Sequence, residues 1–467
     1  MQQYRMNWHH ALKIFVFVLV AAALVAIVLS SRATDGQIIP PGEETYTHLN
    51  EVKDIQEGNV TSYLFYDLIL SLLLGCMSLS TAMIVIPGTL LLITIFLFSE
   101  ILRMEGAKPR HMTYALTLIV LSPSILMMYL GFSAYALTVM LVMLIAYLYT
   151  RQSFWYAAVI PFLFFADRIT GLLVIVLLVI LESRKKRTRE AIGMIMIALG
   201  LFILSGFLPA LTLHSLAPFF SIQGNEIFSF FGGAYGYPFI VLFLGILGMI
   251  LPKSSFSNPR YQSLTMLLLI LSLFYDPMRI LSMFILVYYG AIAFDNFMKQ
   301  EWTVASLKHL TLLLIICILF FSTSTTLKDA ISDSPQPHEV EGTELVSRIV
   351  EKNPSLERTT VLTNPSYNDH VAYYTGLDAI RDPTTAYAVL ASQKYSYVKE
   401  VLQDNKVSFI ILDTSKKEGR LWQRSEQGIL FVLQNNRLFK KIYTQGEYAI
   451  YYYTEWNEEQ ATPQITP

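Results

Sequence analysis

Residues 83–102 read MIVIPGTLLLITIFLFSEIL, and this stretch decides the class of fold. A helix of about 20 residues rises about 30 Å, which matches the hydrocarbon core of a bilayer. Similar apolar runs, broken by short polar loops, continue through the first 322 residues. The stretch is therefore typical of one transmembrane helix among many.

The composition of the whole chain agrees with a membrane protein. Hydrophobic residues make up 54% of the 467 residues and charged residues 15%, against about 25% charged in an average soluble chain. The mean hydropathy is +0.48, and a soluble core has a limit to the apolar surface it can bury. The net charge of -1 predicts no nucleic-acid partner. Cys76 and Cys317 lie in apolar runs, which excludes a disulfide framework and a cysteine-based zinc site.

The apolar runs define the expected membrane spans. Residues 11–30 lack a convincing cleavage site, so we expect a retained first helix. Residues 62–82 are either a span or a helix on the membrane surface, and residues 154–182 are either one span or two short ones that meet at Asp167 and Arg168. The other candidate spans are 83–102, 112–129, 133–150, 191–211, 237–251, 262–275, 280–296 and 307–322.

Basic residues select between these alternatives, because they concentrate in cytoplasmic loops. With 62–82 on the surface and 154–182 as two spans, the outer loops contain only Arg32, Lys53, Arg168 and Arg279. The opposite choice leaves Arg168 within the membrane, where a charge costs several kcal/mol. We therefore expect a polytopic α-helical membrane protein of the cell membrane, with about 11 spans and an outer loop at 31–82.

The tail differs in character from the apolar part. We expect a membrane domain over 1–322, a polar linker with two prolines over 323–338, a soluble extracytoplasmic α/β domain over 339–456 and a disordered tail over 457–467. Within the α/β domain the patterns predict strands at 359–363 and 407–413, a helix at 393–405, and a hairpin in which Gln445-Gly446 separates FKKIYT from EYAIYYY.

The first outer loop is strongly acidic and reads PPGEETYTHLNEVKDIQEGN over 40–59. Apolar residues recur every third position from Tyr46, which predicts a surface helix with Glu43 and Glu44 in its first turn. The two carboxylates either stabilise the helix N-terminus electrostatically, or Glu44 acts with His48, one turn on, as a base or metal ligand. The residues alone leave both interpretations open.

Three other groups of polar residues lie at expected outer membrane boundaries. Asp167 and Arg168 either neutralise each other in a hairpin or form part of a functional site. Asp276 and Arg279 are an i, i+3 pair that either neutralise each other or, since arginine is suited to binding phosphate, contact a lipid phosphate. Glu226 lies in an outer loop rich in phenylalanine, which is either an interfacial loop or a substrate contact.

These segments together resemble the membrane glycosyltransferases of the GT-C fold class, in particular oligosaccharyltransferase catalytic subunits and their uncharacterised prokaryotic and archaeal relatives. GEETYTHL resembles the family's acidic segment and puts Glu44 at the key acidic position. DPMRILSM, 276–283, resembles the segment whose arginine contacts the phosphate of a lipid-linked donor, here Arg279. VLTNPSYNDHVAYYTGLDAIRD, 361–382, resembles the signature region of the family's tail.

The chain also departs from that family. The acceptor motif WWDYG is absent, and the stretch 127–135, where the second acidic motif should fall, reads MMYLGFSAY without a carboxylate. Glu44 and His48 are the candidate ligands for a divalent metal, Mg²⁺ or Mn²⁺, in a site that then looks incomplete. The resemblance therefore implies sugar transfer more than N-glycosylation.

The resemblance implies a glycosyltransferase that moves a sugar or oligosaccharide from a polyprenyl-phosphate carrier to an extracytoplasmic acceptor, with inversion. Its partners are membrane lipid, the lipid-linked sugar and an acceptor that the sequence does not identify. Glu44 and His48 are the catalytic candidates; Asp167, Arg168, Glu226, Asp276 and Arg279 are the substrate-binding candidates. The alternative is a transport-type or non-enzymatic membrane protein with an extracytoplasmic recognition domain.

The expected topology is tested by cysteine-accessibility labelling at Ser183 and Ser366. Ser183 precedes a basic run that should be cytoplasmic, whereas Ser366 lies in the tail. An impermeant reagent added to intact cells should label a cysteine at 366 and not one at 183. Labelling of both from the same side would overturn the topology.

Overall fold

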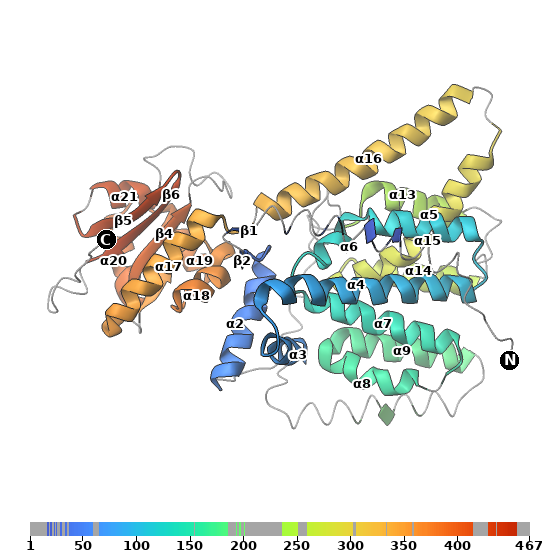
Figure 1. Ribbon diagram of the computed structural model, residues 1–467, viewed down its shortest axis with the longest axis horizontal. Coiled ribbons are helices and arrows are strands. Elements are labelled where there is room, and N and C mark those ends of the chain that lie inside the picture. The colour runs from blue at the N-terminus through green and yellow to red at the C-terminus, as the bar shows by residue number, and fades with distance from the viewer. Residues whose placement is uncertain are drawn as a thin grey trace. The chain divides into compact units, whose positions relative to one another are not determined.

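The computed structural model divides into two compact units, which we describe separately (Figure 1). The first contains residues 1–38 and 52–333, and the second contains residues 39–51 and 334–467. The description below covers scattered positions within 16–34 and 193–200, and continuously 37–58, 65–153, 155–184, 236–250, 259–301, 305–332, 334–356, 359–413, 428–435 and 437–454.

The first unit is mostly helical, and we call it the helical unit. It also contains a two-stranded ribbon of β1 (Ala33–Thr34) and β2 (Gln37–Ile38). Its described helices are α3 (Phe65–Leu74), α4 (Leu79–Met104), α5 (Pro109–Val120), α6 (Pro123–Met128), α7 (Ala134–Thr150), α8 (Tyr156–Ala166), α9 (Arg168–Arg184), α13 (Phe239–Ile250), α14 (Pro259–Leu271), α15 (Asp276–Lys299) and α16 (Ala305–Ser332).

Three of the described helices are long and apolar enough to cross a membrane: α4, α15 and, over Ser306–Thr325, α16. Protein atoms bury 89% of the apolar window of α15, against 56% for α4 and 22% for α16, so α15 is the central helix of the three. The chain is thus a mostly helical membrane protein with a small mixed sheet. The number of about 11 spans stays a prediction.

Buried charge at the far end of α15 is paired. Asp295 is 4% exposed. Nε2 of His111, in α5, lies 2.9 Å from Oδ2 of Asp295. Lys299, one turn further along α15, also contacts Asp295. Removing one partner from a buried pair costs about 3–5 kcal/mol, so this contact fixes α5 against α15.

Two local breaks differ in how well the sequence anticipates them. Residues 154–182 form two helices, α8 and α9, which meet at Asp167 as predicted. Residues 112–129 do not form one helix as expected, because α5 ends before Pro123, which lacks an N–H and begins α6. Residues 62–82 contain α3, whose 10 residues are too short to cross a bilayer alone.

The polar segment expected as a linker is partly helical, because α16 continues to Ser332. Both prolines of the segment, Pro335 and Pro337, lie beyond that residue. Before them, the hydroxyl groups of Thr323 and Thr325 donate to carbonyls four residues earlier at 2.9 Å, a bond that an uninterrupted helix allows. Polarity alone therefore did not end the helix.

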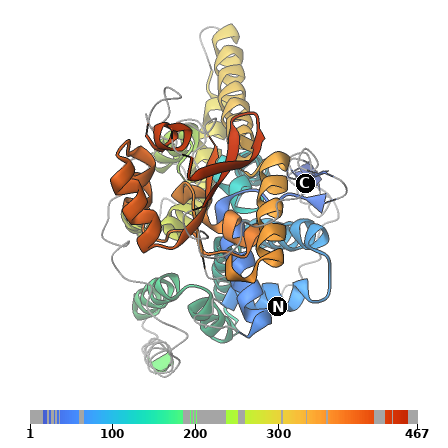
Figure 2. The same cartoon turned by 90° about the vertical axis from the view of Figure 1, so that its left-hand side faces the viewer.

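The second unit, the tail unit, is a mixed sheet with helices on both faces (Figure 2). The strand order is β3-β4-β6-β5, with β3 parallel to β4 and the other pairs antiparallel. The strands are β3 (Thr360–Leu362), β4 (Val407–Asp413), β5 (Phe439–Gln445) and β6 (Tyr448–Tyr453). The helices are α17 (Pro337–Lys352), η2 (Pro354–Leu356), η3 (Pro365–Tyr367), α18 (Asn368–Thr375), α19 (Pro383–Ala391), α20 (Tyr395–Asp404) and α21 (Ile429–Asn435).

Alternation along β4 divides the tail core into two layers. Ile410 and Leu412 pack with α19, α20 and α21, whereas Phe409 and Ile411 pack with α17 and α18. This is the period of two that places successive side chains on opposite faces of a strand. Gly446, with φ of +59°, begins the turn of the predicted β5–β6 hairpin.

Close packing of α13 on α15 gives a stability prediction. A Cβ atom at Gly248 would lie 1.9 Å from the carbonyl oxygen of Tyr289, so Gly248→Ala should force the helices apart. Overpacking costs about 1–3 kcal/mol, and we expect a lower midpoint of thermal unfolding in detergent. Gly88→Ala in α4 is the matched control: no atom lies within 4 Å of its Cβ position, and alanine favours a helix by about 1 kcal/mol. Equal midpoints for the two variants would contradict the packing.

Candidate functional site

The predicted acidic helix is α2 (Glu43–Glu57), and its first nine residues belong to the tail unit. Tyr46, Leu49 and Val52 of the predicted apolar stripe are 0–3% exposed. Gly42, with φ of +77°, turns the chain into the helix, and the hydroxyl of Thr45 donates to the Pro41 carbonyl at 2.8 Å. Glu43 and Glu44 lie in the first turn, as the sequence predicts.

Glu43 binds the N-terminus of α18, although 326 residues separate it from its partner there. Its Oε1 accepts a hydrogen bond of 2.5 Å from the backbone N–H of Asp369. The N-cap residue of α18, Tyr367, makes no side-chain capping bond. A carboxylate at a helix N-terminus is stabilised by the exposed N–H groups, so Glu43 caps α18 from a distant part of the chain.

Other contacts between α2 and α18 surround this bond. Nδ1 of the buried His370 lies 3.5 Å from Oε2 of Glu43, an ion pair when the imidazole is protonated. Thr47 donates to the carboxylate of Asp369, and Asn50 donates to the Asp369 carbonyl at 2.8 Å. We call this set of contacts the α2–α18 clamp.

Tyr46 supplies the apolar part of the clamp. Its ring lies 5.7 Å from the rings of both Tyr373 and Tyr374 and 5.8 Å from that of His370, in tilted arrangements. Its hydroxyl is 3.3 Å from the Tyr374 hydroxyl. Burial raises the pKa of Tyr373, which keeps this phenol neutral. Aromatic pairs of this geometry add about 0.5–1.5 kcal/mol beyond their area burial.

Glu44 and His48, the catalytic candidates, lie one turn apart on the same helix. Oε1 of Glu44 is 3.9 Å from Nε2 of His48, and the Glu44 side chain is 35% exposed whereas that of His48 is 5% exposed. Both carboxylates are partly exposed, Glu43 at 31%, but it is that of Glu43 that accepts from the N-terminus of α18. Among the described residues, no group of three or more His, Cys, Asp or Glu side chains is arranged to hold a metal ion. The pair does not by itself supply a metal site, and we derive no step through a metal.

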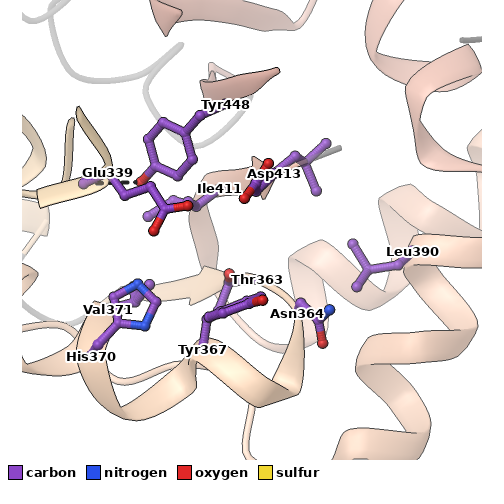
Figure 3. Close-up of a pocket in the computed structure, with 11 residues that line it drawn as sticks. Glu339, Thr363, Asn364, Tyr367, His370, Val371, Leu390, Ile411, Asp413 and Tyr448 are labelled. Carbon is purple, nitrogen blue, oxygen red and sulfur yellow. Dashed lines mark hydrogen bonds between the residues drawn. The ribbon is translucent and has the colours of Figure 1, made fainter. Parts of the chain in front are cut away.

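A small polar cavity lies beside the clamp, within the tail unit (Figure 3). Its volume of about 20 Å³ holds about one water molecule. Glu339, Asp413 and Tyr448 line one side, and Tyr367 and His370 line the other. Burial, together with Glu339 and Asp413, raises the pKa of Tyr448 well above its usual value, so its hydroxyl remains a donor, to the Glu339 carbonyl at 3.4 Å. The cavity is too small for a sugar.

In the helical unit, Asp167 caps α9. Its Oδ1 accepts from the backbone N–H groups of Ile169 and Thr170 at 3.0 and 3.2 Å, and its Oδ2 accepts from the Thr170 hydroxyl at 2.6 Å. The hydroxyl of Tyr275 also donates to Oδ2. Since Tyr275 is the N-cap residue of α15, this bond joins the beginnings of α9 and α15.

Arg279 and Asp276 form an ion pair within the first turn of α15. Nη2 of Arg279 lies 3.1 Å from Oδ1 of Asp276, and its Nε donates to the Ser272 carbonyl at 3.3 Å. Arg279 is 1% exposed, the largest of the fully buried side chains. The structure thus brings Asp167, Arg168, Asp276 and Arg279 to one pair of adjoining helix ends.

The remaining sequence candidate, Glu226, lies outside the described residues. Nothing in the sequence predicts Tyr275 as the partner of Asp167, or Asp369 and His370 as partners of Glu43. Tyr46 was interpreted only as a member of an apolar stripe. The period of three along the apolar stripe predicts which face of α2 is buried. It does not predict that this face contacts α18, because α18 lies more than 300 residues later in the chain.

Comparisons with known proteins show the fold of the chain. No protein-family profile matches it, and no curated protein matches its sequence. The archaeal oligosaccharyltransferase AglB from Archaeoglobus fulgidus, in complex with an inhibitory peptide and a dolichol-phosphate, matches with a TM-score of 0.59 at 11% identity, over 96% of this chain and 75% of that chain. The apo form of the A. fulgidus enzyme gives 0.59 at 13% identity, over 98% and 76%.

A second kind of glycosyltransferase has a similar fold. The arabinofuranosyltransferase AftD from Mycobacteria matches with a TM-score of 0.57 at 13% identity, over 93% of this chain and 40% of that chain. Both neighbours are GT-C fold glycosyltransferases, so the resemblance stated from the sequence is confirmed at the level of the fold. Identities this low show the fold alone.

The clamp predicts how α2 responds to two neighbouring substitutions. Glu43→Ala removes the acceptor for the Asp369 N–H and the anion beside His370. A hydrogen bond to a charged group contributes about 1.5–3 kcal/mol, less for a side chain that is 31% exposed. Amide exchange in 43–50 and 368–375 of the full chain should accelerate by about tenfold. Glu44→Ala is the control and should leave these rates within about twofold of wild type; equal acceleration would contradict the clamp.

Proposed function

We propose that this protein is a membrane glycosyltransferase that transfers a sugar or oligosaccharide from a polyprenyl-phosphate carrier to an extracytoplasmic acceptor. The observation that carries the proposal is the fold likeness over 96% of this chain to an oligosaccharyltransferase described in complex with a dolichol-phosphate. The similar fold of an arabinofuranosyltransferase supports sugar transfer in general rather than one acceptor. A fold alone does not define a reaction, so the residues must supply the chemistry.

Glu44 is the proposed general base. Its carboxylate takes the proton of the acceptor nucleophile, which then attacks the anomeric carbon of the donor sugar. The bond from that carbon to the phosphate oxygen breaks, and the carrier leaves as a polyprenyl phosphate. Displacement from the face opposite the phosphate inverts the anomeric centre. The exposed position of Glu44 and the near approach of His48 support this role.

Negative charge grows on the phosphate as it leaves, and fixed donors stabilise that charge best. We assign this task to the joined ends of α9 and α15, where Asp167 caps α9 and accepts from Tyr275, and where Asp276 holds the guanidinium group of Arg279. The tail unit, outside the cytoplasm in the proposed topology, would bind the acceptor. Glu226 remains a proposed substrate contact.

The test compares Glu44→Gln with Glu43→Gln in membranes that contain a radiolabelled lipid-linked sugar pool. Glu44→Gln keeps the shape and removes the base, so turnover should fall by about 10²–10⁴-fold while donor binding persists. Glu43→Gln retains an oxygen that accepts from the Asp369 N–H, and turnover should change by less than about tenfold.

The outcomes separate the proposals. Equal losses in both variants would point to one shared site at the first turn of α2. A Glu44→Gln variant with wild-type turnover would remove the base assignment and favour the transport-type or recognition protein as the alternative. A wild-type protein that transfers no sugar from any lipid-linked pool would end the glycosyltransferase proposal.

A further inference from the structure

The two arginines at the adjoining ends of α9 and α15 differ in how their charge is satisfied. Arg279 is buried, bonded to a backbone carbonyl and paired with Asp276. Arg168 follows Asp167 directly, and a neutralising pair between these neighbours was one expectation from the sequence. The structure does not form that pair, because Asp167 is engaged by Thr170, by two backbone N–H groups and by Tyr275.

Arg168 therefore keeps an unmatched positive charge among the described residues. Its Nη2 atom is enclosed by protein and has no hydrogen-bond partner in the described part of the chain. The residue as a whole is only partly buried, so other atoms of its guanidinium remain reachable. An N–H donor that is enclosed without an acceptor costs free energy, and an anionic ligand that accepts from it would offset that cost.

We propose that Arg168 binds a phosphate group of a lipid, and that Arg279 is a positioning residue that holds the first turn of α15 rather than the first contact for the phosphate. Planar guanidinium matches phosphate geometry with two parallel hydrogen bonds. Arg279 has already used its Nε and Nη2 atoms within the protein, whereas Nη2 of Arg168 has no partner among the described residues. The inference deepens the proposed function and rests on it where the lipid is the sugar carrier.

Two lipids carry the same chemistry: a polyprenyl phosphate and an ordinary anionic phospholipid. Both present a phosphate at the membrane boundary, where Arg168 is expected from the charge distribution. The proposal names the shared phosphate group, and the experiment distinguishes the two sources.

The experiment measures binding to the full chain in nanodiscs of phosphatidylcholine, with a fluorescent decaprenyl monophosphate as the probe. The variants are Arg168→Gln, Arg168→Lys and Arg279→Lys. Arg184→Gln, at the other end of α9, is the matched control. Loss of a charge-assisted contact should raise the Kd about 10- to 100-fold in Arg168→Gln. Arg168→Lys should recover part of the affinity, Arg279→Lys should lose less affinity than Arg168→Gln, and Arg184→Gln should stay within about threefold of wild type.

A second arm omits the probe, adds increasing fractions of phosphatidylglycerol to the nanodiscs, and measures the midpoint of thermal unfolding of the protein. If wild type binds no decaprenyl phosphate but phosphatidylglycerol stabilises it through Arg168, the phosphate site stands and the proposed donor fails. If wild type binds the probe and Arg168→Gln binds equally well, the inference fails while the proposed function stands. An affinity loss confined to Arg279→Lys would also overturn it. Absence of both kinds of binding in wild type would overturn the inference and the donor together.

Discussion

Charge that leaves water must be matched, and this constraint governs the central helix of the helical unit. α15 has buried charge at both ends: Asp276 with Arg279 at its beginning, and Asp295 with His111 and Lys299 near its end. Asp295 and Arg279 are 4% and 1% exposed, so neither can rely on solvent, and each is matched by a less buried partner of opposite charge, Lys299 or Asp276. The contact of His111 with Asp295 places α5 beside the end of α15. The hydrogen bond between Tyr275 and Asp167 places α9 beside the beginning of α15. Apolar packing alone would specify such neighbours less well.

The elements that the sequence predicted well are those with local causes. The buried stripe of α2 follows from its period of three, and the β5–β6 hairpin follows from alternation around Gly446. The break at Asp167 is predicted because the distribution of basic residues, and the cost of Arg168 within a membrane, favour two helices over one. Where two local signals compete, prediction was weaker: Pro123 split an apolar run expected to be continuous, and α16 continued into a polar stretch that lacks proline until Pro335.

The candidate site was predictable in its residues and not in its contacts. The sequence predicts Glu43 and Glu44 in one helical turn, where neighbouring side chains point about 100° apart. It contained no sign that Glu43 caps α18, since a cap is normally a neighbour in sequence and this one is 326 residues away. Likewise Asp167 and Arg168 are adjacent and opposite in charge, which suggested a pair. Four groups donate to the Asp167 carboxylate instead, and one of them, the Tyr275 hydroxyl, comes from the N-cap of α15. Nη2 of Arg168 is then left without a partner among the described residues.

The membership of residues 39–51 in the tail unit has a consequence for biogenesis. During synthesis this segment emerges early, whereas Asp369 and His370 follow only after the whole helical unit has been made. Tyr46 and Leu49, buried in the finished protein, must wait exposed until then. The closure of so long a loop is only modestly costlier in entropy than that of a short one, because the cost grows with the logarithm of length. The long connection therefore costs time more than free energy, and until the tail is made the apolar face of α2 is a surface that a chaperone can bind.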